Sequence, residues 1–237
     1  MLLHAETDTR SRNHILATLP QVEYEHLVPH LRRVNLPLAK VLYKEGDAID
    51  RVYFVEKGVT SMVLTTREGV EVEVGLVGPE GLVGLGGLIP DSKSLGKMAM
   101  QMGGNGWQMP ASVLRDEFKR GGVLQDLVLQ FNQAFAIMAS QTALCNRLHT
   151  VEERLSRWLL QVHDRVRKDD LELTQEFLSQ MLGSRRAGVT VAAGALKKAG
   201  FIDYNRGSIT ILDREGLENA ACECYGVAKD LFRRGIG

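Results

Sequence analysis

Several features are scarce in this 237-residue chain, and each scarcity excludes a class of protein. Only three cysteines occur, too few for a disulfide framework. Basic and acidic residues both total 29, so net charge predicts no general attraction to nucleic acid or membrane. No apolar run approaches the roughly 18 residues of a membrane helix, and residues 1–10 lack the apolar core of a signal peptide. We therefore expect a cytoplasmic protein with no membrane partner.

The segment from residue 33 to residue 109 alternates apolar and polar side chains in short runs separated by glycines. This alternation is typical of half-buried antiparallel strands, and glycines suit the turns between them. Short helices are expected before it, at 11–31. The segment itself predicts a compact β-roll, with strands at 40–44, 52–55, 60–64 and 70–74 and glycine turns at 45–47, 56–58 and 67–69.

A glycine-rich stretch, 75–87, contains six glycines. Its exposed backbone amides could cradle a phosphate. Alternatively, the glycines serve the tight corners of a small roll. We favour the second interpretation.

A heptad pattern after residue 123 predicts one long helix. The chain offers no second helix of equal length to cover its apolar seam. The seam could still pack inside the chain, but we favour a near-parallel, two-stranded homodimer. Its expected interface is Leu124, Leu127, Phe131, Ala134, Met138, Gln141, Cys145 and Leu148.

The segment 174–212 has the pattern of a helix-turn-helix followed by a hairpin. Thr174 can cap a first helix, Gly183 ends it, and Ser184 can cap a second helix that runs to Gly200. Two strands joined at 205–207 then add a wing. Between residues 183 and 211, five basic residues and one acidic residue give a charge of +4. The basic character of a neutral chain is therefore concentrated in this module.

The second helix of this module predicts DNA binding. Arg185 and Arg186 open it, where side chains and helix amides can approach phosphates or base edges together. The alternative is a solvated helix start. The expected contacts are Thr174, Ser184, Arg185, Arg186, Gly188, Val189, Thr190 and Arg206.

Over nearly its full length the chain resembles the Crp/Fnr family of bacterial transcription regulators. The resemblance rests on Lys-Glu-Gly-Asp at 44–47, Val-Tyr-Phe-Val at 52–55, Gly58, and the segment 174–186. It places Arg186 where the family carries a base-contacting arginine, with a palindromic DNA operator and RNA polymerase as candidate partners. It also implies an α+β fold: a jelly-roll-like N-terminal β-roll sensor domain (1–120), a dimerisation helix (121–149) and a C-terminal winged helix-turn-helix domain (150–237).

The sensor domain departs from the family pattern. Its cyclic-nucleotide binders carry a Gly-Glu-Leu-Gly segment and then an Arg-Ser pair that holds the cyclic phosphate. Here the corresponding stretches are 83–86 (Val-Gly-Leu-Gly) and 94–95 (Ser-Leu). A bound phosphate would lack its charged partners unless Lys93 or Lys97 replaces them, so we expect no control by cyclic AMP. The expected effector pocket is Gly84, Leu85, Gly86, Ser94, Leu95, Ser140 and Gln141.

No cofactor or metal is expected from the sequence. The N-terminal cysteine cluster of iron–sulfur sensors is missing. His26 and His30 are interpreted as surface residues and not as haem ligands. Cys145 is expected to pack as a small apolar side chain. Cys222-Glu-Cys224 is also a pattern seen in metal and redox sites. The two thiols should point to different sides of a helix, however, and no third and fourth ligand is apparent nearby, so we favour a structural role.

These patterns predict a homodimeric, sequence-specific DNA-binding transcription regulator. An enzyme is not expected, because no paired carboxylates or nucleophile–base set is apparent. The alternative is a ligand-binding or protein-interaction module whose winged helix docks a protein. Salt dependence separates the two, since phosphate neutralisation makes affinity fall steeply with added salt.

Overall fold

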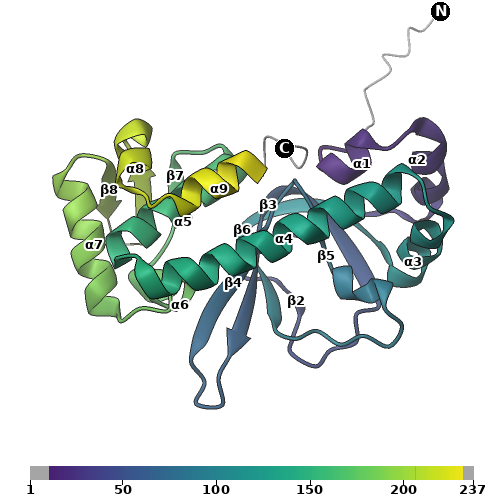
Figure 1. The fold of residues 1–237 in the computed structure, drawn as a ribbon, viewed down its shortest axis with the longest axis horizontal. Helices are drawn as coiled ribbons and strands as arrows, with labels where there is room; N and C mark the ends of the chain where they lie inside the picture. Colours follow the sequence, from purple (N-terminus) through teal and green to yellow (C-terminus); the bar gives the residue numbers. More distant parts are fainter. Residues whose placement is uncertain (1–10, 206, 232–237) are drawn as a thin grey trace, which may run out of the picture.

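The computed structural model describes residues 11–205 and 207–231. A β-roll forms one half of the molecule and a smaller module of helices and three strands forms the other (Figure 1). One long helix crosses the roll and reaches the module. The expected α+β fold is confirmed, with its helix-turn-helix at the C-terminal side.

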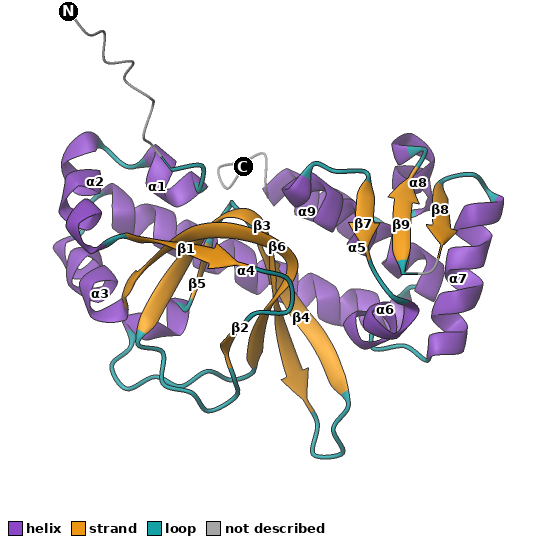
Figure 2. Cartoon of the chain, turned by 180° about the vertical axis from the view of Figure 1, so that it is seen from behind, coloured by secondary structure: helices purple, strands orange, loops and turns teal. Residues whose placement is uncertain are grey.

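The roll is a six-stranded antiparallel sheet. Its strands pair in the order β1-β6-β3-β4, with β2 also on β6 and β5 on β3 (Figure 2). Three short helical segments precede it: α1 (His14–Thr18), α2 (Gln21–Leu27) and η1 (Val28–His30). The strands are β1 (Arg32–Leu36), β2 (Val41–Tyr43), β3 (Arg51–Thr65), β4 (Glu71–Val77), β5 (Leu82–Val83) and β6 (Lys97–Pro110).

One strand, β3, replaces the two expected at 52–55 and 60–64. Gly58 does not turn the chain. It lies inside β3 with φ +96°, at a point where the pairing register between β3 and β6 shifts. A Cβ on residue 58 would lie 2.4 Å from the Met102 carbonyl oxygen. The long partner β6 keeps β3 extended, so the irregularity is a bulge. The expected turns at Gly46 and Gly69 do have positive φ.

The glycine-rich stretch lets the long helix approach the roll closely. A Cβ on Gly81 would lie 1.9 Å from the Phe131 ring, and one on Gly75 would lie 2.7 Å from the Phe135 ring. Both positions therefore need a residue without a side chain. This arrangement supports the packing interpretation of these glycines. A single-turn 3-10 helix, η2 (Leu85–Leu88), ends the stretch.

The long helix is α4 (Val123–Leu148), and it follows α3 (Ala111–Arg120). The carboxylate of Glu23 accepts hydrogen bonds from the first two amides of α4, at 3.0 and 2.8 Å. It thereby satisfies two donors that have no partner inside the helix. The expected long helix is confirmed.

The C-terminal module begins with α5 (Val151–Val166), whose first turn is closed by a capping box between Thr150 and Glu153. Trp158 and Leu159 of this helix are buried in the module core. A sheet in the order β7-β9-β8 covers one side. The remaining elements are β7 (Asp170–Glu172), α6 (Gln175–Met181), α7 (Arg186–Lys198), β8 (Ile202–Asn205), β9 (Ser208–Ile211), α8 (Arg214–Ala220) and α9 (Cys224–Leu231).

The roll and the module share a buried polar contact around Glu73. Trp158 Nε1 of α5 donates to Glu73 Oε1 at 2.9 Å, and Gln101 Nε2 of β6 donates to Glu73 Oε2 at 2.6 Å. Burial raises the pKa of this carboxyl to about 7, although both hydrogen bonds and the charge of Arg157 oppose the shift. Below pH 7 the protonated form of Glu73 is therefore favoured inside the fold.

We expect Glu73→Gln to remove part of the pH dependence of stability. A carboxyl whose pKa is raised on folding stabilises the folded state most below its unfolded pKa of about 4.3. This stabilisation is lost as the pH rises towards 7. A shift of this size corresponds to about 3 to 4 kcal/mol. The free energy of unfolding, measured with urea, should fall less between pH 5 and pH 8 in the variant than in the wild type.

The control is Glu68→Gln, because Glu68 lies in the exposed turn before β4. Its pH dependence should equal that of the wild type. Among the described residues, Gln101 Oε1 is buried without a hydrogen-bond partner. Rotation of the Gln101 amide would let this oxygen accept from the new amide at position 73. An unchanged pH dependence in Glu73→Gln would contradict the assignment.

Candidate functional site

The two helices of the helix-turn-helix are α6 and α7. The Thr174 hydroxyl caps α6 by accepting from the Phe177 amide at 3.1 Å, as expected. Gly183 has φ +53° in the turn. Ser184 does not cap α7, because Arg185 occupies that position and makes no side-chain cap bond. The Ser184 hydroxyl instead contacts Arg154 Nη1 at 3.4 Å.

The two sides of α7 have different surroundings. Val189 is fully buried on the side that faces α5 and α6, which contradicts its prediction as a DNA contact. Gly188 is half-buried. The opposite side is a continuous exposed face made of Arg186, Ala187, Thr190, Val191, Gly194, Lys197 and Lys198.

Polar side chains on this face differ in how strongly neighbouring residues hold them. The Arg186 side chain is 67% exposed, and its nearest carboxylate, on Glu176, is 4.0 Å away. The Thr190 hydroxyl hydrogen-bonds Gln175 Oε1 and the Arg186 carbonyl, both at 3.0 Å. Lys197 is held by Asp203 of β8 at 2.6 Å. Arg186 is thus free to reach outward, whereas Lys197 fastens the helix to the wing.

The wing is the β8–β9 hairpin. Its turn contains Gly207, with φ +90°. A Cβ there would lie 3.5 Å from Thr174 Cγ2, so the hairpin tip stands beside the start of α6. Arg206 lies outside the described residues.

The expected effector residues do not converge on one pocket. Leu95 is 78% exposed, and the Ser94 and Ser140 hydroxyls donate to carbonyls of their own segments. Gly84, Leu85 and Gly86 lie at η2, where Gly86 faces Ile49 and Ser92. Gln141 donates to Cys224 Sγ at 3.0 Å, in another part of the molecule. Lys97, a candidate anion partner, pairs with Glu71.

A cleft of about 1310 Å³ opens between the roll and the C-terminal module. It is lined by residues of both, and none of the expected effector residues contributes to it. At its edge Arg165 of α5 pairs with Glu80 of the roll at 2.9 Å, and both side chains are more than nine-tenths buried. The cleft therefore separates two units that are joined by a buried ion pair.

The predicted dimer seam on α4 faces the interior of the chain. Leu124, Leu127, Phe131 and Ala134 are at most 8% exposed because they pack against the roll, and Cys145 is completely buried. Met138 lines a small cavity with roll residues, Gln141 is half-buried, and Leu148 is 69% exposed. The sheet thus takes the place of the equally long helix that the seam appeared to require, and most of the predicted interface is unavailable to a second copy.

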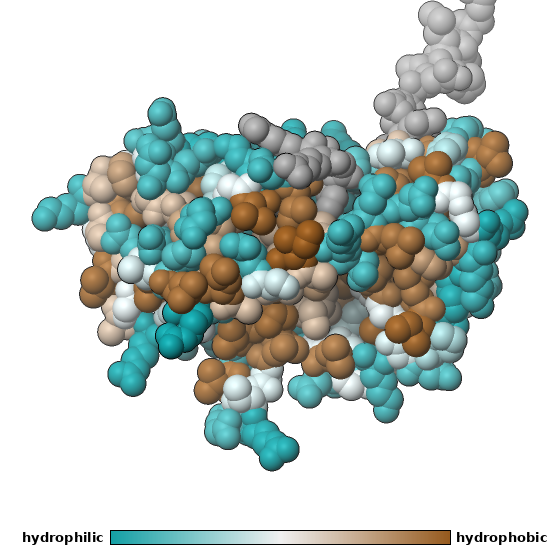
Figure 3. All heavy atoms as spheres, in the orientation of Figure 1, coloured by the Kyte–Doolittle hydropathy of each residue, from teal (hydrophilic) through white to brown (hydrophobic). Residues whose placement is uncertain are grey.

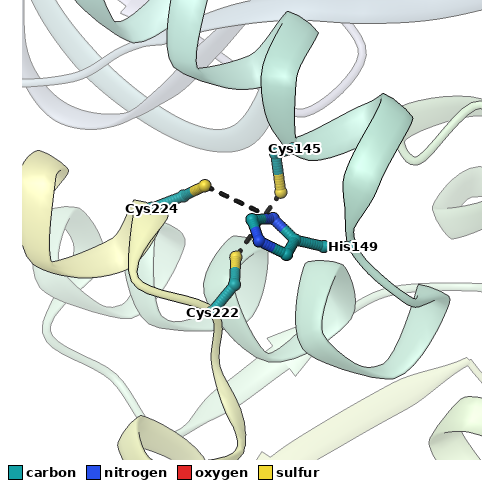
Figure 4. Close-up of side chains that lie close together, drawn as sticks. All are labelled: Cys145, His149, Cys222 and Cys224. Atoms are coloured by element: carbon teal, nitrogen blue, oxygen red, sulfur yellow. Dashed lines mark hydrogen bonds between the residues drawn. The ribbon is translucent and has the colours of Figure 1, made fainter.

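The three cysteines meet a histidine where α4 ends (Figure 4). The thiols of Cys145, Cys222 and Cys224 and a ring nitrogen of His149 all lie within 4.8 Å of one another. Cys222 precedes α9, which starts at Cys224, so the two thiols are not forced apart by a helix. The sequence argument that no further ligands are near is therefore corrected. His149 was missed, although it stands one helical turn after Cys145.

Hydrogen bonding shifts the pKa values of two of these thiols in opposite directions. The Cys145 and Cys222 sulfurs are 3.5 Å apart. This contact lowers the pKa of Cys145 and, together with burial, raises that of Cys222. The charge of Arg157 lowers the pKa of Cys145 further. The contact therefore favours ionisation of the Cys145 thiol over that of Cys222.

Comparison with known proteins assigns both halves of the chain. Residues 33–120 match the cyclic nucleotide-binding domain, and residues 153–220 match the Crp-like helix-turn-helix domain. No curated protein sequence matches the chain significantly. Among the described residues, no helix has both the length and the apolar character needed to cross a membrane.

Several solved structures share this fold. One, described as a transcriptional regulator of the Crp/Fnr family from Eubacterium rectale, has a TM-score of 0.68 at 16% identity, covering 85% of this chain and 94% of that one. FixK2 from Bradyrhizobium japonicum has a TM-score of 0.66 at 16% identity, and the match covers 81% of this chain and 98% of that one. The c-di-GMP-responsive global regulator CLP from Xanthomonas campestris has a TM-score of 0.63 at 16% identity, and the match covers 81% of this chain and 99% of that one. At these identities the likeness shows the fold.

Proposed function

This chain belongs to the Crp/Fnr family of transcription regulators, and we propose that it binds specific DNA sequences as a homodimer and is not an enzyme. The observation that carries this proposal is the exposed face of α7. The face is long enough to enter a major groove, begins with Arg186 directly after Arg185, and carries no side chain at Gly194. Its opposite side is anchored in the module core by Val189 and Leu196.

Within this surface we assign separate roles to the basic residues. Arg186 is exposed at the first turn of α7, where its guanidinium can form a bidentate contact with guanine. Arg185 stands one residue before the helix, at a position suited to phosphate. Lys198 is exposed at the other end of α7. These placements support base reading by Arg186 and positioning of the duplex by Arg185 and Lys198.

Dimerisation is proposed through the outward side of α4, because the inward seam is already occupied. This outward face consists of Leu129, Gln133, Ala136, Ser140, Ala143 and Leu144, five of them apolar or small. Figure 3 shows apolar side chains gathered on the side of the molecule that α4 crosses. Small residues at Ala136, Ser140 and Ala143 permit close approach of a second helix. A second copy placed there would present two α7 helices to a palindromic site.

Control by cyclic AMP is not part of the proposal. The loop that would hold the phosphate offers the exposed Leu95 and a Ser94 hydroxyl bonded to Gly96. Lys97 is already paired with Glu71. No arginine replaces the charge that a cyclic phosphate requires at this loop. The similar structure from Xanthomonas campestris is described as responsive to c-di-GMP, so the fold itself accommodates other effectors.

The experiment is selection of a binding motif from a randomised DNA library, followed by affinity measurements at several salt concentrations. We expect a palindromic motif and a loss of affinity of about a thousand-fold between 50 and 200 mM salt, as for six or more phosphate contacts. Adding cyclic AMP should leave the affinity unchanged. Failure to enrich any motif, together with salt-insensitive binding, would favour a module that docks a protein.

A further inference from the structure

We propose that Cys145, His149, Cys222 and Cys224 bind one Zn²⁺ ion, which fastens the end of α4 to the segment between α8 and α9. All three cysteines of the chain belong to this set. Three thiolates and one imidazole form a complete tetrahedral ligand set of the kind found in structural zinc sites. Because no coordination position remains open for water, the role is structural and not catalytic.

The spacing of the ligand atoms fits a tetrahedral ion. Bonds of about 2.3 Å from zinc to sulfur and about 2.0 Å to nitrogen place two sulfurs about 3.8 Å apart and a sulfur about 3.5 Å from the nitrogen. Cys145 and Cys222 Sγ are 3.5 Å apart, and Cys224 Sγ is 3.5 Å from His149 Nδ1. All four atoms lie within 4.8 Å of one another. Adjustments of about 1 Å or less in these separations would complete the site.

The histidine is oriented for coordination through Nδ1. Its other ring nitrogen, Nε2, lies 3.2 Å from Glu223 Oε2. A carboxylate that accepts from Nε2–H leaves Nδ1 unprotonated and directed at the thiols. Figure 4 shows the imidazole among the three sulfurs, with Cys145 on α4 and His149 directly after the end of that helix. Glu223 is therefore a positioning residue for the site.

Two buried arginines supply positive charge beside the cluster. Arg154 and Arg157 are 7% and 4% exposed. Within the described part of the chain, neither forms an ion pair with a carboxylate, and the Nε of each has no hydrogen-bond partner. Buried cations without a counter-charge are unfavourable. Three thiolates and Zn²⁺ carry a net charge of −1, which would give the two guanidinium groups a negative counter-charge.

The ligands come from parts of the chain that are distant in sequence. Cys145 and Cys222 are separated by 77 positions. A metal ion at this point would join the helix that lies along the roll to the module that contains α7. We therefore expect Zn²⁺ to stabilise the fold and to set the orientation of that module relative to α4.

The first test is metal content of the full-length chain purified under reducing conditions. Elemental analysis should find about one zinc per chain. Removal with a strong chelator should lower the melting temperature, and Zn²⁺ but not Mg²⁺ should restore it, because thiolates prefer the softer ion. Replacement by Co²⁺ should give the visible spectrum of a tetrahedral, thiolate-coordinated ion. None of these measurements involves DNA, so they stand apart from the proposed function.

Variants then assign the ligands by competition with a coloured zinc indicator. Cys222→Ser should weaken zinc binding by at least about a hundred-fold. Glu223→Gln, on an exposed side chain that leaves the ligands intact, should weaken it by about 10- to 100-fold. The control is His26→Asn, since His26 lies far along the chain on α2 and should not affect binding.

Three results would overturn the assignment. One is a chain that takes up neither zinc nor cobalt after full reduction. Another is iron with acid-labile sulfide in place of zinc. The third is a metal-free chain two hydrogens lighter, with a disulfide between Cys145 and Cys222. The cobalt spectrum of the wild type decides the question even if Cys222→Ser fails to fold.

Discussion

Arg186→Ala is expected to weaken binding of the dimer to its preferred operator by about 2 to 6 kcal/mol. One bidentate arginine–guanine contact contributes about 1 to 3 kcal/mol of discrimination, and each substitution removes it from both half-sites. Arg186 is exposed at the start of α7, and a carboxylate 4.0 Å away holds it only weakly. The loss should therefore be that of the DNA contact and not of a structural bond.

The diagnostic readout is the binding motif. Selection from a randomised library should show reduced preference at one symmetric pair of positions for Arg186→Ala. Arg185→Ala should weaken all sequences similarly, and Arg120→Ala, a change on the roll helix α3, should have no effect. An unchanged motif in Arg186→Ala would mean that another part of α7 reads the bases.

Ala136→Glu is expected to convert the dimer into monomers at micromolar concentration. In a two-fold symmetric interface the substitution brings two carboxylates together and inserts bulk where the helices approach most closely. Burying such charges without partners costs on the order of several kcal/mol. Ala136 is exposed in the single chain, and glutamate is a good helix former. Folding of the monomer should therefore be preserved.

Sedimentation equilibrium measures this effect, with circular dichroism as the check on folding. Gln130→Glu, which is exposed on α4 but points away from the centre of the outward face, is the matched control and should remain dimeric. Met138→Glu addresses the inward side, where Met138 lines a cavity with Phe131 and Leu76. It should lower thermal stability instead. A dimer that survives Ala136→Glu would place the interface elsewhere.

The amino-acid sequence determined the elements whose signals are local. The 3- and 4-residue spacing of apolar residues predicts α4, and Thr174 and Gly183 mark the two ends of α6. Capping bonds and helical periodicity join residues within a few positions. For this reason the helix-turn-helix was correctly placed from these residues alone.

Contacts between distant residues were decided only by the tertiary structure. The apolar seam of α4 has the same spacing whether a second helix or a sheet covers it. The sheet covers it here because Gly75 and Gly81 leave room for the rings of Phe135 and Phe131. Pairing with β6 turned two expected strands into one. The meeting of Cys145 and Cys222 across 77 positions depends on how α9 packs against α4. Sequence spacing contains no record of such a contact, because it arises from packing between elements and not from local backbone preference.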